Sequence, residues 1–388
     1  MAASHDPATQ PRTFIPASGC RSTGAIAASC RAWNPAPCAN PSEENIMYVV
    51  RPVEMADLPR LEMLCRRDNQ RVHTLPQSRH GLAALVEQSV ASFQSRPALP
   101  ADERYTFVLE SAADGALAGT ASLVAQAGGG ASFLAFRQDM MQQVSPDLDV
   151  SNNVDMLMLC SDLSGYSQLA GYHAPGPAIG HEHKCLLGRA RLMYAALAPQ
   201  RFAHKFFASL PGATDGSKRS PFWDAIGRNF FHMDFMQVEK LLGGARNRAL
   251  IAGLMPHYPV YVSLLPADAR AALATVDPLA RGGFEMLCDE GFEANDYVDI
   301  CDGGPLLQAS RHALKSYSSS MRRGVSQREH ASAAGARRYL VCNAREQGFR
   351  AIAAASDPVE QQEFITLTLE ERRLLDVGAG DEVVCIQL

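Results

Sequence analysis

Along most of the chain, apolar and polar residues recur with regular periods that predict a mixture of strands and helices. The stretch "MYVVRPV" (47–53) alternates as a β-strand does, and "EMADLPRLEMLCRRD" (54–68) has the three-to-four spacing of an amphipathic helix. A second helix is predicted over 81–95. Alternating residues on either side of the turn "AADGA" predict a β-hairpin with strands at 105–111 and 117–127.

The pattern continues with two more predicted strands, "VDMLMLCSDLSG" (154–165) and "SQLAGYHA" (167–174). A loop then leads into "KCLLGRARLMYAALAPQRF" (184–202), where apolar residues recur every three or four positions as in a helix. One strand, two helices, several antiparallel strands, a loop and a helix are the order typical of an α/β or α+β fold.

The stretch "SPFWDAIGRNFF" (220–231) is predicted to be helical. It begins with Ser-Pro, a pair that favours a capped helix start because Ser accepts a backbone N–H and Pro fits the first turn. Trp223, Phe230 and Phe231 have the spacing of one helix face, so we expect all three side chains in the core.

Composition divides the chain into five expected segments. Residues 1–46 are rich in Ala, Pro and Ser and lack periodicity, so we expect a disordered extension or a start assigned too far upstream. Two α/β segments are expected at 47–205 and 206–310. A polar linker at 311–337 is expected to lead to a small β-rich segment at 338–388.

Composition and charge also exclude several classes of protein. The 388 residues are 47% hydrophobic and 20% charged, which is ordinary for a globular enzyme. The net charge of -5 provides no basic field for nucleic acid, and no apolar run approaches the ~20 residues needed to span a bilayer. The ten cysteines include no Cys-x-x-Cys pair, which favours reduced thiols in a cytoplasmic protein over a zinc or disulfide framework.

The loop "GPAIGHEHKCLLGRAR" (176–191) carries the most informative chemistry. Its glycines precede a basic helix start, which is typical of a phosphate-binding loop because the N–H groups of a helix N-terminus face the anion. A metal site at His-Glu-His and a plain surface loop are the alternatives. A metal is disfavoured, since the two histidines lack the i, i+4 spacing of zinc-binding helices and no third ligand is identifiable.

Four stretches resemble the arginine N-succinyltransferase family, and within it the alpha-subunit type of the arginine/ornithine succinyltransferases. They are "RPVEMADLPRLEMLC" (51–65), "SPFWDAIGRNFF" (220–231), "LMPHYPVYVSLLP" (254–266) and "EGFEANDYVDICDGGPLL" (290–307). Phe-Trp, Arg-Asn-Phe-Phe, His-Tyr-Pro and Asp-Gly-Gly-Pro occur in the family's order and separations. The similarity extends over most of 47–310 and more weakly through the C-terminal strands.

The resemblance implies an acyl-CoA N-acyltransferase (GNAT-like) fold, expected in tandem, with the β-rich segment as a C-terminal appendage. It also implies transfer of succinyl from succinyl-CoA to the α-amino group of arginine or ornithine, in cytoplasmic arginine catabolism. Succinyl-CoA is then a co-substrate, and no metal is expected. A hetero-oligomer with a beta-type paralogous subunit is a further implication, whereas neither nucleic acid nor a membrane is an expected partner.

The resemblance assigns CoA binding to the glycine-containing loop and to the strand before it. Gly176 and Gly180 are expected to let the backbone approach the pyrophosphate, and His183 and Lys184 to contact it. Tyr172 falls where the family contacts succinyl-CoA along the strand. The loop departs from the family's Gly-x-Gly turn, since Glu182 and Lys184 stand near the glycine positions and the Glu182 carboxylate repels phosphate.

Amide formation from an amine and a thioester needs a base, an oxyanion donor and an acid for the leaving thiolate. The family's proton donor is a His in Gln-Val-His-Pro, and Asp277 in "ATVDP" (274–278) stands in its place. An Asp with an ordinary pKa of ~4 is ionised at neutral pH, so it serves as a base or caps a turn before Pro278. His257 matches another family position and is either structural or a catalytic or substrate contact.

Two further residues match family positions near the substrate. Thr74 lies in "RVHTLP" (71–76), where the family has a Thr-Ser-Leu-Pro loop. Asp302 begins "DGGP" (302–305), and its carboxylate either caps a tight turn or binds the guanidinium of arginine.

These features leave more than one function open. The chain is an active succinyltransferase, or it is a catalytically impaired paralogue that acts as partner or regulatory subunit of an active one. Asp277 at the family's His position and the altered loop favour the second hypothesis, whereas the long motifs support the fold under both. A third hypothesis is an N-acyltransferase for a different amine, with Asp277 or a chain of water molecules as base.

Overall fold

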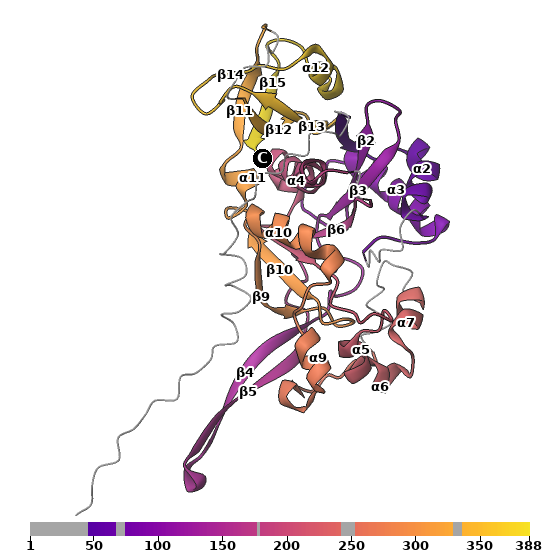
Figure 1. The fold of residues 1–388 in the computed structure, drawn as a ribbon, viewed down its shortest axis with the longest axis vertical. Helices are drawn as coiled ribbons and strands as arrows, with labels where there is room; N and C mark the ends of the chain where they lie inside the picture. The colour runs from indigo at the N-terminus through magenta and orange to yellow at the C-terminus, as the bar shows by residue number, and fades with distance from the viewer. Residues whose placement is uncertain (1–45, 67–73, 177–178, 242–252, 329–335) are drawn as a thin grey trace, which may run out of the picture. The chain divides into compact units, whose positions relative to one another are not determined.

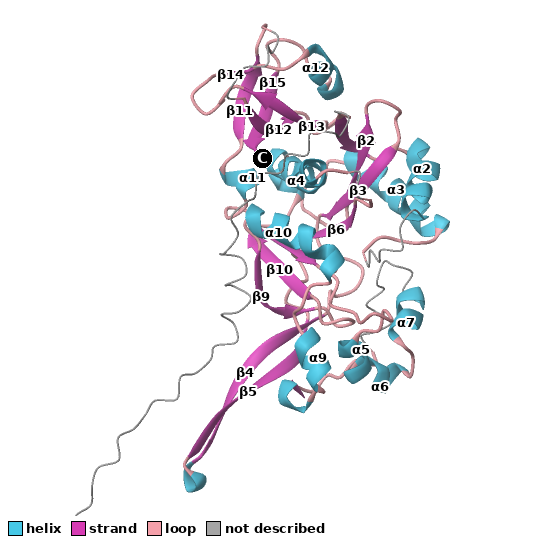
Figure 2. Cartoon of the chain, in the orientation of Figure 1, coloured by secondary structure: helices cyan, strands magenta, loops and turns pink. Residues whose placement is uncertain are grey.

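The computed structural model describes residues 46–66, 74–176, 179–241, 253–328 and 336–388, so the extension expected before residue 46 lies outside the described residues. The strands of this part of the chain are β1 (Tyr48–Pro52), β2 (Arg104–Ser111), β3 (Leu117–Val124), β4 (Ala135–Ser145), β5 (Val150–Cys160), β6 (Ser167–His173), β7 (Lys205–Ser209), β8 (Val260–Tyr261), β9 (Glu293–Val298), β10 (Pro305–Ser310), β11 (Met321–Val325), β12 (Arg337–Asn343), β13 (Ala351–Ser356), β14 (Phe364–Ile365) and β15 (Glu382–Gln387) (Figure 1). The α-helices are α2 (Leu58–Arg66), α3 (Arg79–Gln94), α4 (His181–Leu197), α5 (Pro221–Ala225), α6 (Gly227–Phe231), α7 (Phe235–Leu241), α9 (Ala267–Ala272), α10 (Arg281–Glu290), α11 (Lys315–Ser318) and α12 (Leu369–Leu375) (Figure 2).

The elements predicted before residue 205 are present, because their periodicity reflects which side of each element is buried. The β2–β3 hairpin and β1 follow the alternating stretches, and α2, α3 and α4 follow the helical ones. The Ser78 hydroxyl caps α3 by accepting the Gly81 N–H at 3.0 Å. Leu82, Leu85 and Val86 then form the buried side of that helix.

The described strands form one sheet in the order β14-β11-β15-β12-β13-β1-β2-β3-β6-β7-β10-β9-β4-β5-β8. Neighbouring strands are antiparallel except for β11 with β14 and β6 with β7. The parallel pair β6–β7 requires a crossover connection, and α4 provides it. Residues 167–169 of β6 pair with 206–208 of β7, and β6 then continues to His173 without β7 as its neighbour.

Residues 206–310 complete the sheet that residues 47–205 begin, which differs from the expected pair of consecutive domains. β7 pairs with β6, β10 with β7, and β9 with β10. The reason lies in β7, where residues 206–209 are all buried. A strand covered on both faces needs sheet neighbours and packing on each side. The described residues accordingly belong to one compact unit.

The structure corrects the linker interpretation of residues 311–337 in their described part. α11 and β11 lie there, and β11 pairs with both β15 and β14. Its polar side chains make specific contacts: Arg322 forms an ion pair with Glu382, and Arg323 donates to the Val359 carbonyl at 2.9 Å. Polar composition therefore indicated solvent-facing side chains in this segment rather than a lack of regular structure.

β4 and β5 form a long hairpin of eleven residue pairs (Figure 1). Near its base, β4 pairs with β9 over two residues and β5 pairs with β8 over two residues. Among the described residues the rest of the hairpin has no further strand beside it, so it extends from the sheet as a two-stranded ribbon.

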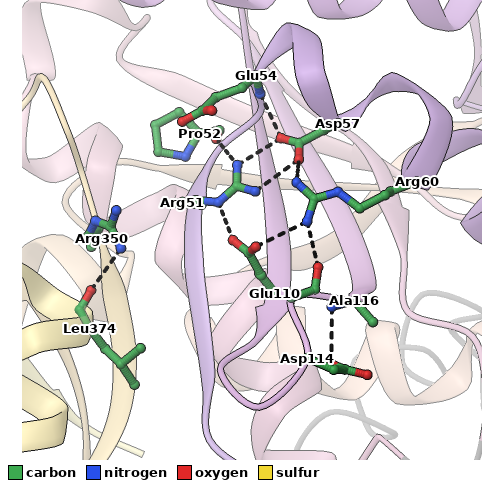
Figure 3. Close-up of polar contacts among 11 residues, drawn as sticks. Arg51, Pro52, Glu54, Asp57, Arg60, Glu110, Asp114, Ala116, Arg350 and Leu374 are labelled. Carbon is green, nitrogen blue, oxygen red and sulfur yellow. Dashed lines mark hydrogen bonds and ion pairs between the residues drawn. The ribbon is translucent and has the colours of Figure 1, made fainter.

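A buried ion network joins β1 to the start of the helical segment and to β2 (Figure 3). Arg51 donates from Nη1 and Nη2 to the Asp57 carboxylate at 2.8 and 2.9 Å, and it also pairs with Glu110. Arg60 bonds to both acids. Asp57 is fully buried and accepts a further hydrogen bond from the Glu54 N–H at 2.8 Å. These donors replace the water that burial removes.

Helix α4 lies in the largest apolar cluster that the described residues form. Residues 186–195 are all buried, so this helix is covered on nearly every side rather than along one stripe. The buried set includes two arginines, Arg189 and Arg191. No helix in the described part of the chain is both long and apolar enough to cross a membrane.

Candidate functional site

A cavity of about 740 Å³ opens where β6 and β7 separate. Its lining comes from β6, from α4 as far as Arg191, from the end of β7 and the loop after it, from α7, from the start of α10 and the segment before it, and from Asp302 before β10. Six of the nine residues singled out in the sequence line this one cavity: Thr74, Tyr172, Gly176, Lys184, Asp277 and Asp302. The fold thus brings together candidates that lie far apart along the chain.

An irregularity in β6 shapes the wall beside Tyr172. The pairing of β3 with β6 shifts register between Thr120 and Ser122, and Gly171 has a φ of +57°, which favours glycine. A Cβ at Gly171 would stand 3.0 Å from the Ser122 Oγ. The Gly171 N–H donates to the Thr74 Oγ1 at 2.8 Å, so Thr74 holds this bend of the strand in place.

Tyr172 follows the bend and ties β6 to α4. Its hydroxyl donates to the Lys184 backbone carbonyl at 3.1 Å, and its ring centroid lies 5.6 Å from the guanidinium carbon of Arg191. Burial raises the pKa of the Tyr172 phenol, with Cys185 adding to the rise and Arg191 opposing it. The hydroxyl is therefore protonated at neutral pH and acts as a donor.

The loop that was expected to bind phosphate leads into the N-terminus of α4. Gly180 is the N-cap residue, and its carbonyl accepts the Lys184 N–H at 3.2 Å. Lys184 and His181 both line the cavity. Gly176 has a φ of +94° and open space around it, so backbone conformation rather than crowding favours glycine there. The first N–H groups of a helix and its dipole attract negative charge.

Two other side chains of this loop are placed differently from the sequence prediction. The His183 ring packs against Tyr48 of β1 with centroids 4.6 Å apart, and His183 does not line the cavity. Glu182 forms an ion pair with Arg338 of β12. The negative charge that was expected to repel phosphate is therefore offset by a guanidinium from the C-terminal segment.

Asp277 both caps a turn and lines the cavity. Its Oδ1 accepts the Leu279 N–H at 2.9 Å, which caps the short helical turn at 278–280. Its Oδ2 accepts the Thr214 hydroxyl at 3.3 Å. The two roles weighed for this residue are compatible in this geometry. A carboxylate at this place in the wall can serve as a proton acceptor for a group in the cavity.

Asp302 caps the turn predicted at "DGGP". Its Oδ1 accepts the Gly304 N–H at 2.9 Å, and Gly303 has a φ of +69°. The turn packs tightly on the loop after β7, because a Cβ on Gly304 would lie 2.2 Å from the Leu210 carbonyl oxygen and one on Gly212 would lie 2.4 Å from the Asp302 carbonyl oxygen. The turn interpretation explains the glycines, and it brings the buried Asp302 to the cavity wall.

His257 is exposed and does not line the cavity. Gly180 does not line it either. The cavity also has lining residues that the sequence did not single out, among them His173 and Arg191, which are 3% and 2% exposed. The signal for Arg191 was a charged residue inside the apolar run "LLGRARLMY" (186–194).

Cys185 is another lining residue that sequence reasoning missed. Its Sγ lies 3.3 Å from the His181 Nε2, one helical turn away. Burial raises the pKa of the Cys185 thiol to about 11, with Arg189 opposing and Asp289 adding to the rise, so the thiol is protonated at neutral pH. Within the described ranges, no group of three or more His, Cys, Asp or Glu side chains is arranged to hold a metal ion.

Two family models and several known proteins are similar to this chain over most of its length. A family model described as Arginine N-succinyltransferase beta subunit matches residues 48–316, and one described as the C-terminal domain of that subunit matches 322–387. The alpha subunit of arginine N-succinyltransferase from Pseudomonas aeruginosa is 36% identical over 337 residues, which are 87% of this chain and 98% of that protein. Arginine N-succinyltransferase from Yersinia enterocolitica is 33% identical over 342 residues, covering 88% of this chain and 98% of that protein.

A solved structure agrees with these matches. Arginine/ornithine succinyltransferase subunit AI from Pseudomonas aeruginosa has a TM-score of 0.80 and 34% identity to this chain, and the superposition covers 88% of this chain and 99% of that one. The mixed α/β fold is therefore shared over nearly the full length of the relative. The sequence resemblance is confirmed, and this chain belongs to the arginine N-succinyltransferase family.

Proposed function

We propose that this chain transfers a succinyl group from succinyl-CoA to the α-amino group of arginine or ornithine, as a step of arginine catabolism in the cytoplasm. The observation that carries the proposal is the cavity between β6 and β7, which combines the anion-binding start of α4 with the carboxylate of Asp277. Relatives named arginine N-succinyltransferase over nearly the whole chain support the choice of substrates. Within the proposal, the sheet around β6 and β7 is a GNAT-like acyltransferase fold.

In this proposal the start of α4 receives the pyrophosphate of CoA. The N–H groups of the first turn and the Lys184 and His181 side chains supply the donors and positive charge. β6 has no β7 partner beyond Leu169. The Ala170 carbonyl and the Gly171 N–H are bonded to Arg191 and Thr74, so in this proposal the pantetheine chain lies beside the residues after Gly171. Tyr172 lies on this stretch and lines the cavity, in keeping with its predicted contact to succinyl-CoA.

Asp277 acts in this proposal as the base for the acceptor amine. Its carboxylate accepts one proton from the ammonium, and the free amine attacks the thioester carbonyl. The C–N bond forms as the C–S bond breaks, and the second proton of the nitrogen neutralises the departing thiolate.

The test separates the two roles of Asp277. Asp277→Asn keeps an oxygen that can accept the Leu279 N–H, because Asn caps as well as Asp, but it cannot take a proton. We expect arginine-dependent thiol release from succinyl-CoA to fall by roughly 10²- to 10⁴-fold, the usual contribution of a general base, with an unchanged melting temperature. Full activity in this variant would show that Asp277 only caps the turn.

A second candidate function rests on the same residue. Since Asp277 replaces the family's His, the chain is alternatively a catalytically impaired paralogue that serves as partner or regulatory subunit. The names "subunit alpha" and "subunit AI" of its relatives support a multi-subunit assembly, and a beta-type paralogue is the proposed partner. An inert chain whose Asp277→His variant becomes active would establish this alternative, and arginine-dependent activity of the unmodified chain would exclude it.

A further inference from the structure

Arg191 is a buried cation that lines the cavity without an acid to balance it. The side chain is 2% exposed, and in the described part of the chain no Asp or Glu lies within ion-pair distance of its guanidinium. Burial lowers the pKa of Arg191 to about 10, an effect that Tyr172 opposes, so the guanidinium still carries its charge at pH 7. A desolvated, unbalanced charge is costly, and a bound anion would relieve that cost.

The hydrogen bonds of Arg191 leave one of its nitrogens available. Nε donates to the Gly188 carbonyl, and Nη1 donates to the Ser122 and Ala170 carbonyls, each at 3.1 Å. These bonds use three of the five N–H donors of the guanidinium and fix its plane. Nη2 has no acceptor among the described residues, and its two donors remain for a molecule that enters the cavity.

The neighbouring Arg189 shows the contrast on the same helix. It is equally buried, but its guanidinium pairs with Asp289 and lies 3.2 Å from a carboxylate oxygen of Glu290. Arg189 does not line the cavity. Two buried arginines that stand two positions apart on α4 therefore differ: the one outside the cavity lining is paired with acids, and the one that lines the cavity is not.

We propose that Nη2 of Arg191 binds the free carboxylate of the succinyl group and so selects a dicarboxylic acyl donor. The inference rests on the proposed function, because it places the acyl-CoA along β6. Arg191 bonds to Ala170 and lies against Tyr172, both on the stretch of β6 beyond its last pair with β7. A butyryl chain has the same length but no carboxylate, and it would leave the buried guanidinium without an anion.

The test is isothermal titration of the full chain with CoA and with non-transferable thioether analogues of succinyl-CoA and butyryl-CoA. We expect the unmodified chain to bind the succinyl analogue roughly 10- to 100-fold more tightly than the butyryl analogue, the range for one charge-assisted hydrogen bond. Arg191→Met should abolish this preference, which is read as the ratio of the two analogue affinities and so is independent of any change in the affinity for CoA itself. Arg191→Lys, which keeps the positive charge but lacks the planar guanidinium with its several N–H donors, should retain part of the preference.

Arg189→Met is the matched control, since it should lower the melting temperature and leave the donor preference intact. An unmodified chain that binds both analogues equally, or an Arg191→Met variant that keeps the preference, overturns the proposal. An Arg191→Met variant that no longer discriminates between arginine and its decarboxylated analogue agmatine also overturns it, because Arg191 would then bind the carboxylate of the acceptor. Failure of CoA itself to bind the unmodified chain would refute the proposed function as a whole.

Discussion

Replacing Asp57 by Asn is expected to lower the free energy of unfolding by about 3–5 kcal/mol, the cost of breaking a buried ion pair from one side. The Asp57 carboxylate is fully buried and accepts hydrogen bonds from Arg51, Arg60 and the Glu54 N–H. The amide turns one acceptor oxygen into a donor that faces a guanidinium, and it leaves Arg51 with Glu110 alone. A loss of this size is a large part of the roughly 5–15 kcal/mol that stabilises a typical domain.

Urea unfolding followed by far-UV circular dichroism measures this loss as a lower midpoint with an unchanged slope. The pH dependence adds a second check. Burial alone would raise the pKa of Asp57, but the hydrogen bonds from Arg51 and the Glu54 N–H and the charges of Arg51 and Arg60 lower it overall. Because the unfolded pKa is ~4, the contribution of Asp57 is complete above that pH and is lost as the pH falls through the lower folded-state pKa. The unmodified chain and the variant should therefore converge in strong acid.

Asp139→Asn provides the control for this prediction. Asp139 pairs with Arg137, but their side chains are 32% and 39% exposed, and such pairs contribute only about 0–1 kcal/mol. The double variant Arg51→Met/Asp57→Asn should recover part of the loss, since no guanidinium then faces the amide at position 57. A loss at Asp57 below about 1 kcal/mol, or equal to that at Asp139, would refute the importance of burial in this network.

Three further changes test the cavity and the C-terminal segment. Gly171→Ala places a side chain at a residue with a left-handed backbone conformation, so it should lower the free energy of unfolding by about 1–2 kcal/mol and weaken CoA binding. Unchanged affinity for CoA would show that the bend in β6 does not shape the CoA site. Arg338→Ala removes the ion-pair partner of Glu182 beside the start of α4 and should weaken CoA binding by about 2- to 5-fold. Adding Glu182→Gln should restore the affinity, and calorimetric titration of the single and double variants with CoA measures both effects. Thr368→Ala removes the capping box of α12 and should cost about 1 kcal/mol in urea unfolding, whereas no change would mean that Glu371 or water replaces the cap.

Individual helices and strands were predictable from the sequence where the spacing of apolar residues reflects which face of the element is buried. The strand at 47–53 and the helix at 81–95 correspond to β1 and α3. The helical interpretation of 220–231 was right at its start, where Ser220 caps α5 by accepting the Trp223 N–H at 3.1 Å. It was wrong for Phe230, which is 45% exposed, because the helix is interrupted at Ile226 and the face does not continue through α6.

The arrangement of strands was not predictable from these patterns. Pairing of β6 with β7 or of β1 with β13 depends on contacts between distant residues, and no local period encodes them. The same limit applied to the site. Thr74, Asp277 and Asp302 were found by resemblance, and the sheet explains why they meet. Arg191 was missed because a charged residue in a helical pattern is ordinarily assigned to the solvent, and only the sheet shows that α4 is covered on nearly every side.

The place of β1 in the sheet has a consequence for how this protein is made. β1 pairs with β2 on one side and with β13 on the other, where Val50 stands beside Ala351, roughly 300 residues later in synthesis. At a translation rate of roughly 5–20 residues per second, that edge of β1 stays open on the ribosome for roughly 15–60 seconds. An open strand edge can pair with another chain, so the nascent protein passes through a period of exposure to aggregation. That period ends when residues 351–356 emerge and close the edge.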